Sequence, residues 1–401
     1  MALATNTTAV SAAELHTASR QIITRAVAEL WPDTEVVLGP QCPSVTSYVC
    51  PVTVGSEEMV AKYAWLGMSL VSILRGAGGT WEEVREAQRA YVKSSAGVTA
   101  REAELLQRLR RLGHPRVCGT AGLHDGVLLT RKVTGTPLTA MVAASPWDTE
   151  PLLHAVLFTL GDLHSPAGAQ SLRGAAPIGE RSISTVFSRK FSTPSTTSYL
   201  RALGHGQLPE GERQQTVELM QTAVWRLLQM STALSPRRDT VVYGDLKPEH
   251  VILDGTGRRL TFIDPAVQWA AGPQPDVAKL IGRTLLLGLG HPDPRAGRQI
   301  VQGATSMLAR HIATLPPRDQ EAGLREVLVL WLMDTVSILS TCLSAPPGLP
   351  LAPHQQDLVA QARTVAGVVD RVSALLVGST AGPRLLDAVF SELERTAGSA
   401  R

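Results

Sequence analysis

VVYGDLKPEHVILDGTGRRLTFIDPAVQWAAGPQPD, residues 241–276 of a 401-residue chain, is the stretch that decides the fold. An apolar run leads into Gly244 and Asp245, and Lys247 follows two residues later. A strand-like Val-Ile-Leu, an Asp-Gly-Thr-Gly turn and a second short strand then deliver Asp264, 19 residues after Asp245. Because a hairpin reverses the chain, it can bring the second carboxylate back beside the first. The stretch therefore predicts paired carboxylates that can orient a hydroxyl group and hold a metal ion.

Each aspartate also has a plainer explanation. Asp245 could cap a turn, and Asp264 could belong to an ordinary Asp-Pro turn at the end of a strand. The spacing of the two carboxylates around one hairpin favours the site over these alternatives.

The composition excludes several classes of protein. The net charge is only +3 and no long run of Lys or Arg occurs, which argues against nucleic acid or a membrane as partner. The four cysteines are scattered without metal-ligand spacing and are expected to be reduced thiols of a cytoplasmic protein. The first dozen residues lack the features of a signal peptide and are expected to form a loose tail.

The most apolar window spans residues 327–343. It is short for a membrane span and carries Asp334 near its centre, so it predicts a buried core helix.

Hydrophobic periodicity divides the chain into a small β-rich part and a larger helical part. Helices are expected over 13–30, 81–93 and 99–112, and strands over 35–38, 47–54, 58–65 and 127–133. Thr-Gly-Thr-Pro at 134–137 forms a turn suited to a hinge, and helices dominate from there to the end. The predicted fold class is α+β and bilobal, with a β-rich N-lobe at 1–133 and a larger helical C-lobe at 134–401.

Lys62 lies within the third expected strand between apolar neighbours, where a half-buried ammonium group needs an anionic partner. The plainer explanation is an edge-strand lysine that discourages aggregation. Glu102 is the expected partner because it shares one face of its helix, at i+3, i+4 and i+7 spacing, with three leucines. Glu104 lines up with Arg108 instead, where a solvated ion pair is expected.

The loop between the first two strands, GPQCPSVTSY at 39–48, is the expected phosphate-covering segment. Its candidates are the hydroxyls and amides of Ser44, Thr46 and Ser47. RGAGGT at 75–80 is richer in glycine, but it follows Lys62 in the chain and lacks the lysine of a P-loop, so a flexible loop is expected there.

Together these residues resemble the aminoglycoside phosphotransferase and choline kinase branch of the protein kinase-like superfamily, over most of the chain. REAELLQRL at 101–109 is similar to the small-lobe helix of that branch, and LLTRKVTGTPL at 128–138 to its hinge. TLGDLHS at 159–165 is similar to a large-lobe helix, and PQPDVAKL at 273–280, with Asp276, to the segment that steadies the catalytic loop.

The resemblance implies an ATP- and Mg²⁺-dependent phosphotransferase with an alcohol as acceptor. Asp245 would be the catalytic carboxylate and Asp264 the metal ligand, while Lys62 and Glu102 would serve the nucleotide, with the hydroxyls of the phosphate-covering loop. Lys247 in DLKPE resembles the lysine of Ser/Thr protein kinases that meets the transferring phosphate, as a compact ammonium can.

Two positions depart from the branch. Tyr243 stands where the branch usually has His, and His250 where it usually has Asn. An imidazole nitrogen matches Mg²⁺ less well than an amide oxygen does, so His250 is either a metal ligand or a hydrogen-bonding group.

The class of phosphate acceptor is predicted from the charge and composition of the C-lobe. Residues 151–240 hold nine Lys and Arg against six Asp and Glu, which disfavours a polycationic substrate. GERSISTVFSRKFSTPSTTSY at 179–199 is basic and rich in hydroxyl groups, like a surface for a peptide. With DLKPE, this segment resembles the kinase components of split lanthipeptide and thioamitide dehydratases, which phosphorylate Ser or Thr of a precursor peptide for a partner lyase. A peptide kinase of natural-product (RiPP) biosynthesis is therefore predicted first, and a small-molecule antibiotic kinase and a nucleotide-binding pseudokinase are the alternatives.

Overall fold

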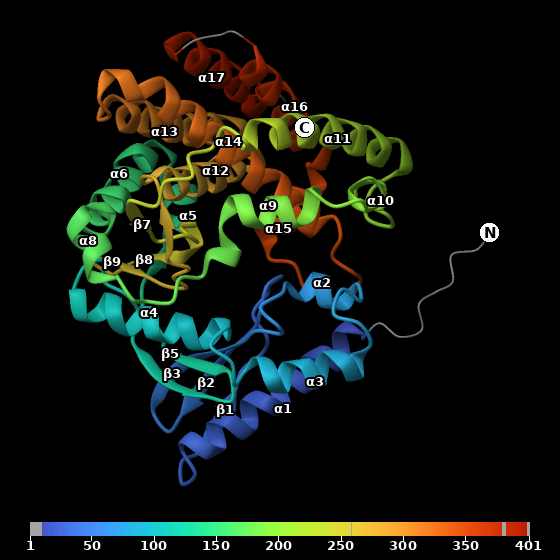
Figure 1. Ribbon diagram of the computed structural model, residues 1–401, viewed down its shortest axis with the longest axis vertical. Coiled ribbons are helices and arrows are strands. Elements are labelled where there is room, and N and C mark those ends of the chain that lie inside the picture. The colour runs from blue at the N-terminus through green and yellow to red at the C-terminus, as the bar shows by residue number, and fades with distance from the viewer. Residues whose placement is uncertain (1–9, 258, 379–381, 399–401) are drawn as a thin grey trace. The chain divides into compact units, whose positions relative to one another are not determined.

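The structure, a computed structural model, describes residues 10–257, 259–378 and 382–398. The chain divides into two compact units, each described here by itself (Figure 1). One unit comprises 1–111, 117–133 and 344–352, and the other 112–116, 134–343 and 353–401. The expected α+β class, with a small antiparallel sheet in one part and a larger helical part, is confirmed.

The first unit is built on a five-stranded antiparallel sheet of order β1-β2-β3-β5-β4. Its strands are β1 (Val36–Leu38), β2 (Tyr48–Val54), β3 (Glu57–Tyr63), β4 (Thr120–His124) and β5 (Val127–Arg131). Its helices are α1 (Ala12–Leu30), α2 (Leu70–Leu74), α3 (Trp81–Tyr91) and α4 (Val98–Leu112).

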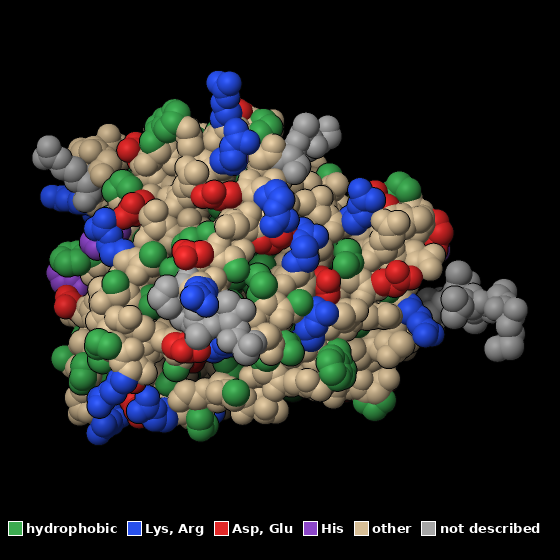
Figure 2. Space-filling model, turned by 90° about the horizontal axis from the view of Figure 1, so that it is seen from above, with side chains coloured by type: hydrophobic (Ala, Val, Ile, Leu, Met, Phe, Trp, Pro, Cys, Tyr) green, Lys and Arg blue, Asp and Glu red, His purple; other side chains and the backbone are tan. Residues whose placement is uncertain are grey.

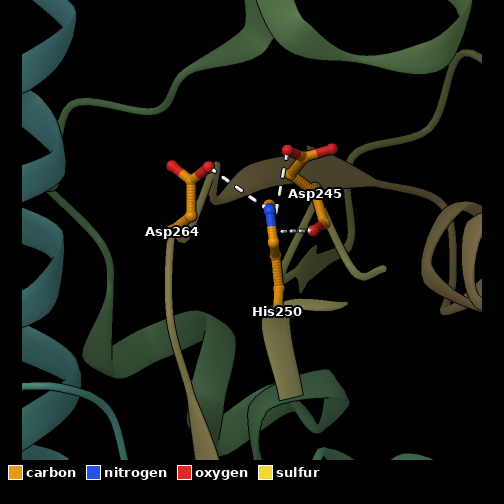
Figure 3. Close-up of side chains that lie close together, drawn as sticks. All are labelled: Asp245, His250 and Asp264. Atoms are coloured by element: carbon orange, nitrogen blue, oxygen red, sulfur yellow. Dashed lines mark hydrogen bonds and ion pairs between the residues drawn. The ribbon is translucent and has the colours of Figure 1, made fainter. Parts of the chain in front are cut away.

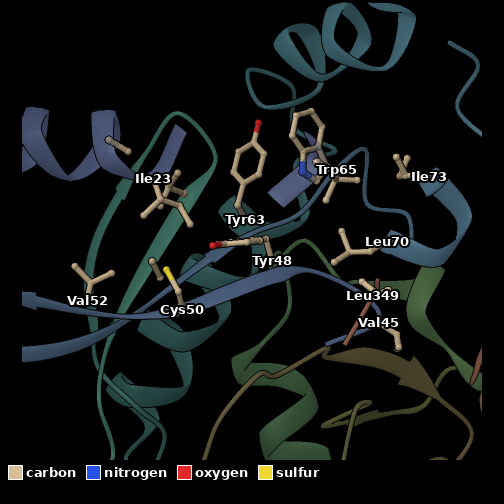
Figure 4. Close-up of a cluster of buried hydrophobic side chains, with 14 of the residues drawn as sticks. Ile23, Val45, Tyr48, Cys50, Val52, Tyr63, Trp65, Leu70, Ile73 and Leu349 are labelled. Carbon is tan, nitrogen blue, oxygen red and sulfur yellow. The ribbon is translucent and has the colours of Figure 1, made fainter. Parts of the chain in front are cut away.

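One apolar core joins the sheet of the first unit to α1 and α2 (Figure 4). Alternate residues of β2 are buried, as the period of a strand requires, and Cys50 and Val52 point into this core with Ile23 of α1. Trp65 lies in the same core, and its indole N–H donates to the Ser19 hydroxyl at 2.9 Å. The one polar atom of the buried Trp65 side chain therefore has a hydrogen-bond partner.

The second unit is mostly helical. Its helices are α5 (Leu138–Ala144), α6 (Thr149–Thr159), α7 (Gly161–His164), α8 (Pro166–Ser171), α9 (Ile183–Phe191), α10 (Thr196–Arg201), α11 (Glu210–Ser231), α12 (Gln274–Gly290), α13 (Pro294–Ala313), α14 (Pro317–Cys342), α15 (Pro353–Ala360), α16 (Ala362–Val377) and α17 (Gly382–Gly398), with short 3₁₀ turns η1 (Pro146–Asp148), η2 (Gly179–Arg181) and η3 (Pro248–His250). Five short strands make two small antiparallel sheets, β6-β8-β9 and β10-β7. They are β6 (Thr136–Pro137), β7 (Thr240–Val242), β8 (Val251–Leu253), β9 (Leu260–Phe262) and β10 (Gln268–Ala270).

The apolar window at 327–343 forms the last part of α14 and its C-cap, Leu343, and is buried along its length, so the expected core helix is confirmed. Within the described ranges, no helix has both the length and the apolar character that crossing a membrane requires. All four cysteines are free thiols. The face of the second unit in Figure 2, over the helices at the top of Figure 1, mixes both signs of charge with isolated apolar side chains.

Several elements differ from the expectations. Strand β4 and helix α2 were not expected, and residues 134–137, expected as a turn, end in the short strand β6. Strand β4 lacks a clear alternation of burial, but it joins β5 through Asp125-Gly126, both with positive φ, which is a recognisable hairpin turn. Residues 1–9 of the expected tail at 1–12 lie outside the described residues. Helix α1 begins at Ala12, directly after a capping box formed by Ser11 and Glu14.

Candidate active site

The backbone before Asp245 is fixed by hydrogen bonds to a buried carboxylate. Asp276, in the first turn of α12, accepts from the amides of Tyr243 at 2.6 Å and Gly244 at 2.7 Å. Its carboxylate also bonds His164 of α7 at 2.9 Å. Because Asp276 is fully buried, these bonds act in a medium that strengthens them. The turn that carries Asp245 is therefore held rigidly to two helices.

Gly244 is required by this turn. Its φ is +89°, in the region that favours glycine, and a Cβ atom there would lie 2.0 Å from the carbonyl oxygen of Ala266. The close approach lets the chain around Ala266 pack directly against the backbone that precedes Asp245.

The β8–β9 hairpin returns Asp264 to the side of this turn. The Ile263 amide donates to the His250 carbonyl at 2.9 Å, and the Tyr243 hydroxyl donates to the Ile263 carbonyl at 2.9 Å. Asp264 itself has a φ of +58°, an uncommon conformation for a residue other than glycine. Such strain at a non-glycine residue is frequent where a side chain must point at a ligand.

Asp245, His250 and Asp264 meet in one cluster (Figure 3). One ligand atom from each side chain lies within 4.8 Å of the others. The His250 Nδ1 atom bonds the backbone carbonyl of Asp245 at 3.0 Å, and its Nε2 atom lies 3.5 Å from Asp264 Oδ2. Two carboxylates and an imidazole form a donor set that fits a divalent cation. The structure thus brings together three of the residues that the sequence singled out.

Two lysines clamp the carboxylate of Asp245, one on each oxygen. Lys247 Nζ lies 3.0 Å from Oδ2, and Lys279 Nζ lies 2.8 Å from Oδ1. Burial works to raise the pKa of Asp245, but Lys247 and Lys279, with His250, outweigh it and hold that pKa well below its usual range. Asp245 is therefore an anion at neutral pH.

The charged contacts around Asp245 extend to Asp334 of α14. Lys279 Nζ lies 3.6 Å from Asp334 Oδ1, and the guanidinium of Arg283 contacts Asp334 at 2.7 Å and 3.3 Å. Burial would lower the pKa of Lys279, yet Asp245 and Asp334 together raise it. Sequence reasoning missed Lys279 and Arg283. The signal was available, because Asp334 in the middle of an apolar helix requires a buried cation as partner.

Arg181, in η2, is a further residue that the sequence did not single out for the site. Its Nη1 atom lies 3.7 Å from Asp264 Oδ1. In the same basic segment, Lys190 turns inward and donates to the Ser337 carbonyl at 2.6 Å and to the hydroxyls of Ser340 and Thr341. Arg181 and Lys190, two cations of the segment 179–199 that was expected to face a peptide, thus contact other residues of this chain.

In the first unit, Lys62 of β3 and Glu102 of α4 form a buried ion pair. The Nζ–Oε2 distance is 2.7 Å, and the two side chains are 11% and 3% exposed. Glu104 pairs with Arg108 at 2.7 Å on the solvent side of α4. The helix periodicity therefore separated the inward glutamate from the outward one.

The hydroxyl-bearing residues of the β1–β2 loop differ in exposure. The Ser44 hydroxyl accepts from the amides of Thr46 at 3.3 Å and Ser47 at 3.4 Å. Ser47 is buried, whereas Thr46 is exposed. Thr46 is thus the most accessible hydroxyl of the three, and a role of this loop in binding phosphate stays a prediction.

No protein-family model matches the sequence, and no curated protein matches it either. Solved structures resemble the chain at low identity. An aminoglycoside phosphotransferase in a ternary complex with streptomycin and ATP has 14% identity and a TM-score of 0.40, covering 80% of this chain and 90% of its own. An ethanolamine kinase of Plasmodium vivax has 9% identity and a TM-score of 0.46, with coverage of 92% and 94%. A choline kinase of Streptococcus pneumoniae has 12% identity and a TM-score of 0.40, with coverage of 87% and 99%.

Proposed function

We propose that the protein is an ATP-dependent phosphotransferase that moves the γ-phosphoryl group to an alcohol. The observation that carries this proposal is the cluster of Asp245, His250 and Asp264, with a lysine on each oxygen of Asp245. Phosphoryl transfer asks a protein for positioned charge more than for covalent chemistry, and this cluster supplies positioned charge of both signs.

Asp245 would accept a hydrogen bond from the acceptor hydroxyl and direct its oxygen at phosphorus. A carboxylate whose pKa is held low by two lysines is a weak base, so it suits orientation first and proton acceptance late. As the new P–O bond forms and the bond to ADP breaks, the hydroxyl proton would pass to Asp245. Lys247 can offset the negative charge of the phosphoryl oxygens.

Asp264 and His250 would hold the divalent cation that accompanies the nucleotide. When bound, such a cation neutralises charge on the phosphates. The sequence predicts Mg²⁺ at Asp264, whereas His250 is the ligand of this pair that suits Mg²⁺ less well.

The Lys62–Glu102 pair supports nucleotide binding by the first unit. A buried lysine held by a glutamate presents an oriented ammonium group, which suits phosphate oxygens. We assign the β1–β2 loop, with Ser44, Thr46 and Ser47, to the phosphates as well, on the strength of its position next to β2 and the exposure of Thr46.

For the acceptor we propose first Ser or Thr of a peptide, as a partner lyase of natural-product biosynthesis would require. Residues 151–240 carry a net positive balance that disfavours a polycation. A cleft of about 300 Å³ in the second unit, with both polar and apolar lining residues, supports an extended acceptor. It is lined by hydroxyls of Ser182, Ser184 and Thr185 and by Arg237 and Arg238. A hydroxylated antibiotic is the second candidate, because the same cleft volume suits a small molecule.

Transfer of label from γ-³²P-ATP to Ser/Thr peptides and to hydroxylated antibiotics separates the two acceptors. Asp245→Asn should reduce transfer by about 100-fold or more, since it removes the orienting carboxylate. Asp319→Asn, which changes an exposed aspartate beside Arg318 in the first turn of α14, is the matched control and should retain activity. Equal rates for Asp245→Asn and wild type, with both folded by circular dichroism, would remove the catalytic role and favour a nucleotide-binding pseudokinase.

A further inference from the structure

The orientation of the His250 ring is fixed by its partners. A backbone carbonyl can only accept a hydrogen bond, so the 3.0 Å contact with the Asp245 carbonyl makes Nδ1 the donor. In the neutral ring the other nitrogen, Nε2, then carries a lone pair. His250 is buried within the second unit, so solvent does not reorient the ring.

The lone pair of Nε2 faces a carboxylate. Asp264 Oδ2 lies 3.5 Å away, while the other oxygen of Asp264, Oδ1, faces Arg181 at 3.7 Å. With the ring neutral, these two electron-pair donors repel each other unless a cation lies between them. The separation is short enough for one cation to bond both atoms at about 2.1 Å.

A carbonyl that fixes the outer nitrogen of an imidazole is the usual arrangement around a metal-bound histidine. Here the carbonyl belongs to Asp245, whose own carboxylate oxygens are held by Lys247 and Lys279. The cation is therefore left chiefly to His250 and Asp264.

From this geometry we infer that His250 Nε2 is a direct metal ligand and that the site binds divalent transition cations in preference to Mg²⁺, with Mn²⁺ as the paramagnetic probe. Imidazole nitrogen suits transition cations, whereas Mg²⁺ strongly prefers oxygen. The inference rests on the proposed function only for what the cation does in catalysis, because binding is measured without nucleotide.

The test is electron spin echo spectroscopy of Mn²⁺ bound to the full-length chain. Wild type should show modulation from a directly bound ¹⁴N nucleus, and its affinity for Mn²⁺ should exceed that for Mg²⁺ by about tenfold or more. His250→Asn should lose the ¹⁴N signal and about tenfold or more of the Mn²⁺ affinity. His354→Asn is the matched control, because His354 lies 4.0 Å from Glu249 and outside the cluster.

If His250→Asn does not fold, wild type labelled with ¹⁵N-histidine supplies the same information, since the coupling must change from ¹⁴N to ¹⁵N. A nitrogen signal that survives in folded His250→Asn, or a wild-type protein with no nitrogen coupling to Mn²⁺, would overturn the inference. If phosphotransfer depends on Asp245 but bound Mn²⁺ shows no nitrogen coupling, this inference fails and the proposed function stands. Nitrogen coupling without phosphotransfer would instead leave the metal site and remove the proposed function.

Discussion

At the scale of single residues, the site is defined by how charge is distributed around Asp245. Lys247 and Lys279 each hold one oxygen, and Lys279 is itself held by Asp334. Lys247 is a neighbour in sequence, but Lys279 comes from α12 and Asp334 from α14. The acidity of Asp245 is therefore set by a sequence neighbour, Lys247, together with residues that lie far away along the chain.

Lys279→Met should move the acidic limb of the pH–rate profile to higher pH. Removing Lys279 takes away a positive charge that lowers the pKa of Asp245, so its carboxylate will take up a proton at higher pH than in wild type. Lys247 and His250 still face Asp245 in this variant, so part of the depression should remain. The profile of kcat against pH measures the shift.

Lys279→Arg is the control, because it keeps the charge between Asp245 and Asp334 and should restore the position of the limb. An unchanged limb in folded Lys279→Met would contradict the assignment of Lys279 as a positioning residue for Asp245. A merely structural role would lower stability without moving the limb.

At the scale of elements, the site depends on short strands rather than on long ones. Strand β7 leads into Asp245, and β8 and β9 form the hairpin that returns Asp264. These strands have three residues each, and their sheets are too small to be stable alone. They are held by buried contacts with the rest of the second unit, such as the bonds from Asp276.

Gly244→Ala should be strongly destabilising, by about 3 kcal/mol or more, since a Cβ atom would meet the Ala266 carbonyl at 2.0 Å in a left-handed conformation. Gly255→Ala, in the hairpin turn, is the matched control. Its added Cβ meets nothing within 4 Å, so its effect should be within about 0.5 kcal/mol. Urea unfolding of both variants measures the difference, and equal midpoints would show that the turn tolerates a side chain.

At the scale of the whole molecule, the candidate residues are divided between the two units. The buried Lys62–Glu102 pair belongs to the first unit, and the Asp245–His250–Asp264 cluster to the second. In the proposed function, Lys62 of the first unit serves the nucleotide and Asp245 of the second unit orients the alcohol. The proposed reaction therefore needs the full chain.

ATP should stabilise the full chain against thermal unfolding, by about 2.7 kcal/mol at 100 times its dissociation constant. Lys62→Met should remove most of this effect, because the ammonium group opposite Glu102 is lost. Lys132→Met is the matched control, since Lys132 pairs with Glu58 in the same unit and its side chain is 49% exposed. Differential scanning fluorimetry measures the shift, and equal shifts in both variants would count against nucleotide binding at Lys62.

Local patterns in the sequence were sufficient to predict several features of the structure. Helix periodicity predicted that Glu102, and not Glu104, is the partner of Lys62, because a helix face shared with leucines points inward. The Asp-Gly-Thr-Gly turn between two apolar runs predicted the β8–β9 hairpin, since turn chemistry acts within a few residues. Asp125-Gly126 carries the same turn signal between β4 and β5, but it was overlooked, so β4 was not predicted.

The sequence by itself determined the two-part α+β organisation, the hairpin and the identity of the paired aspartates, because these depend on periodicity and turn residues that are near one another in the chain. Only the tertiary structure decided that Lys279 would clamp Asp245, that Asp334 would hold Lys279, and that the His250 ring would face Asp264. Contacts between α12, α14 and the turn after β7 depend on how helices pack, because the periodicity of a helix shows which face is buried but not which partner that face meets.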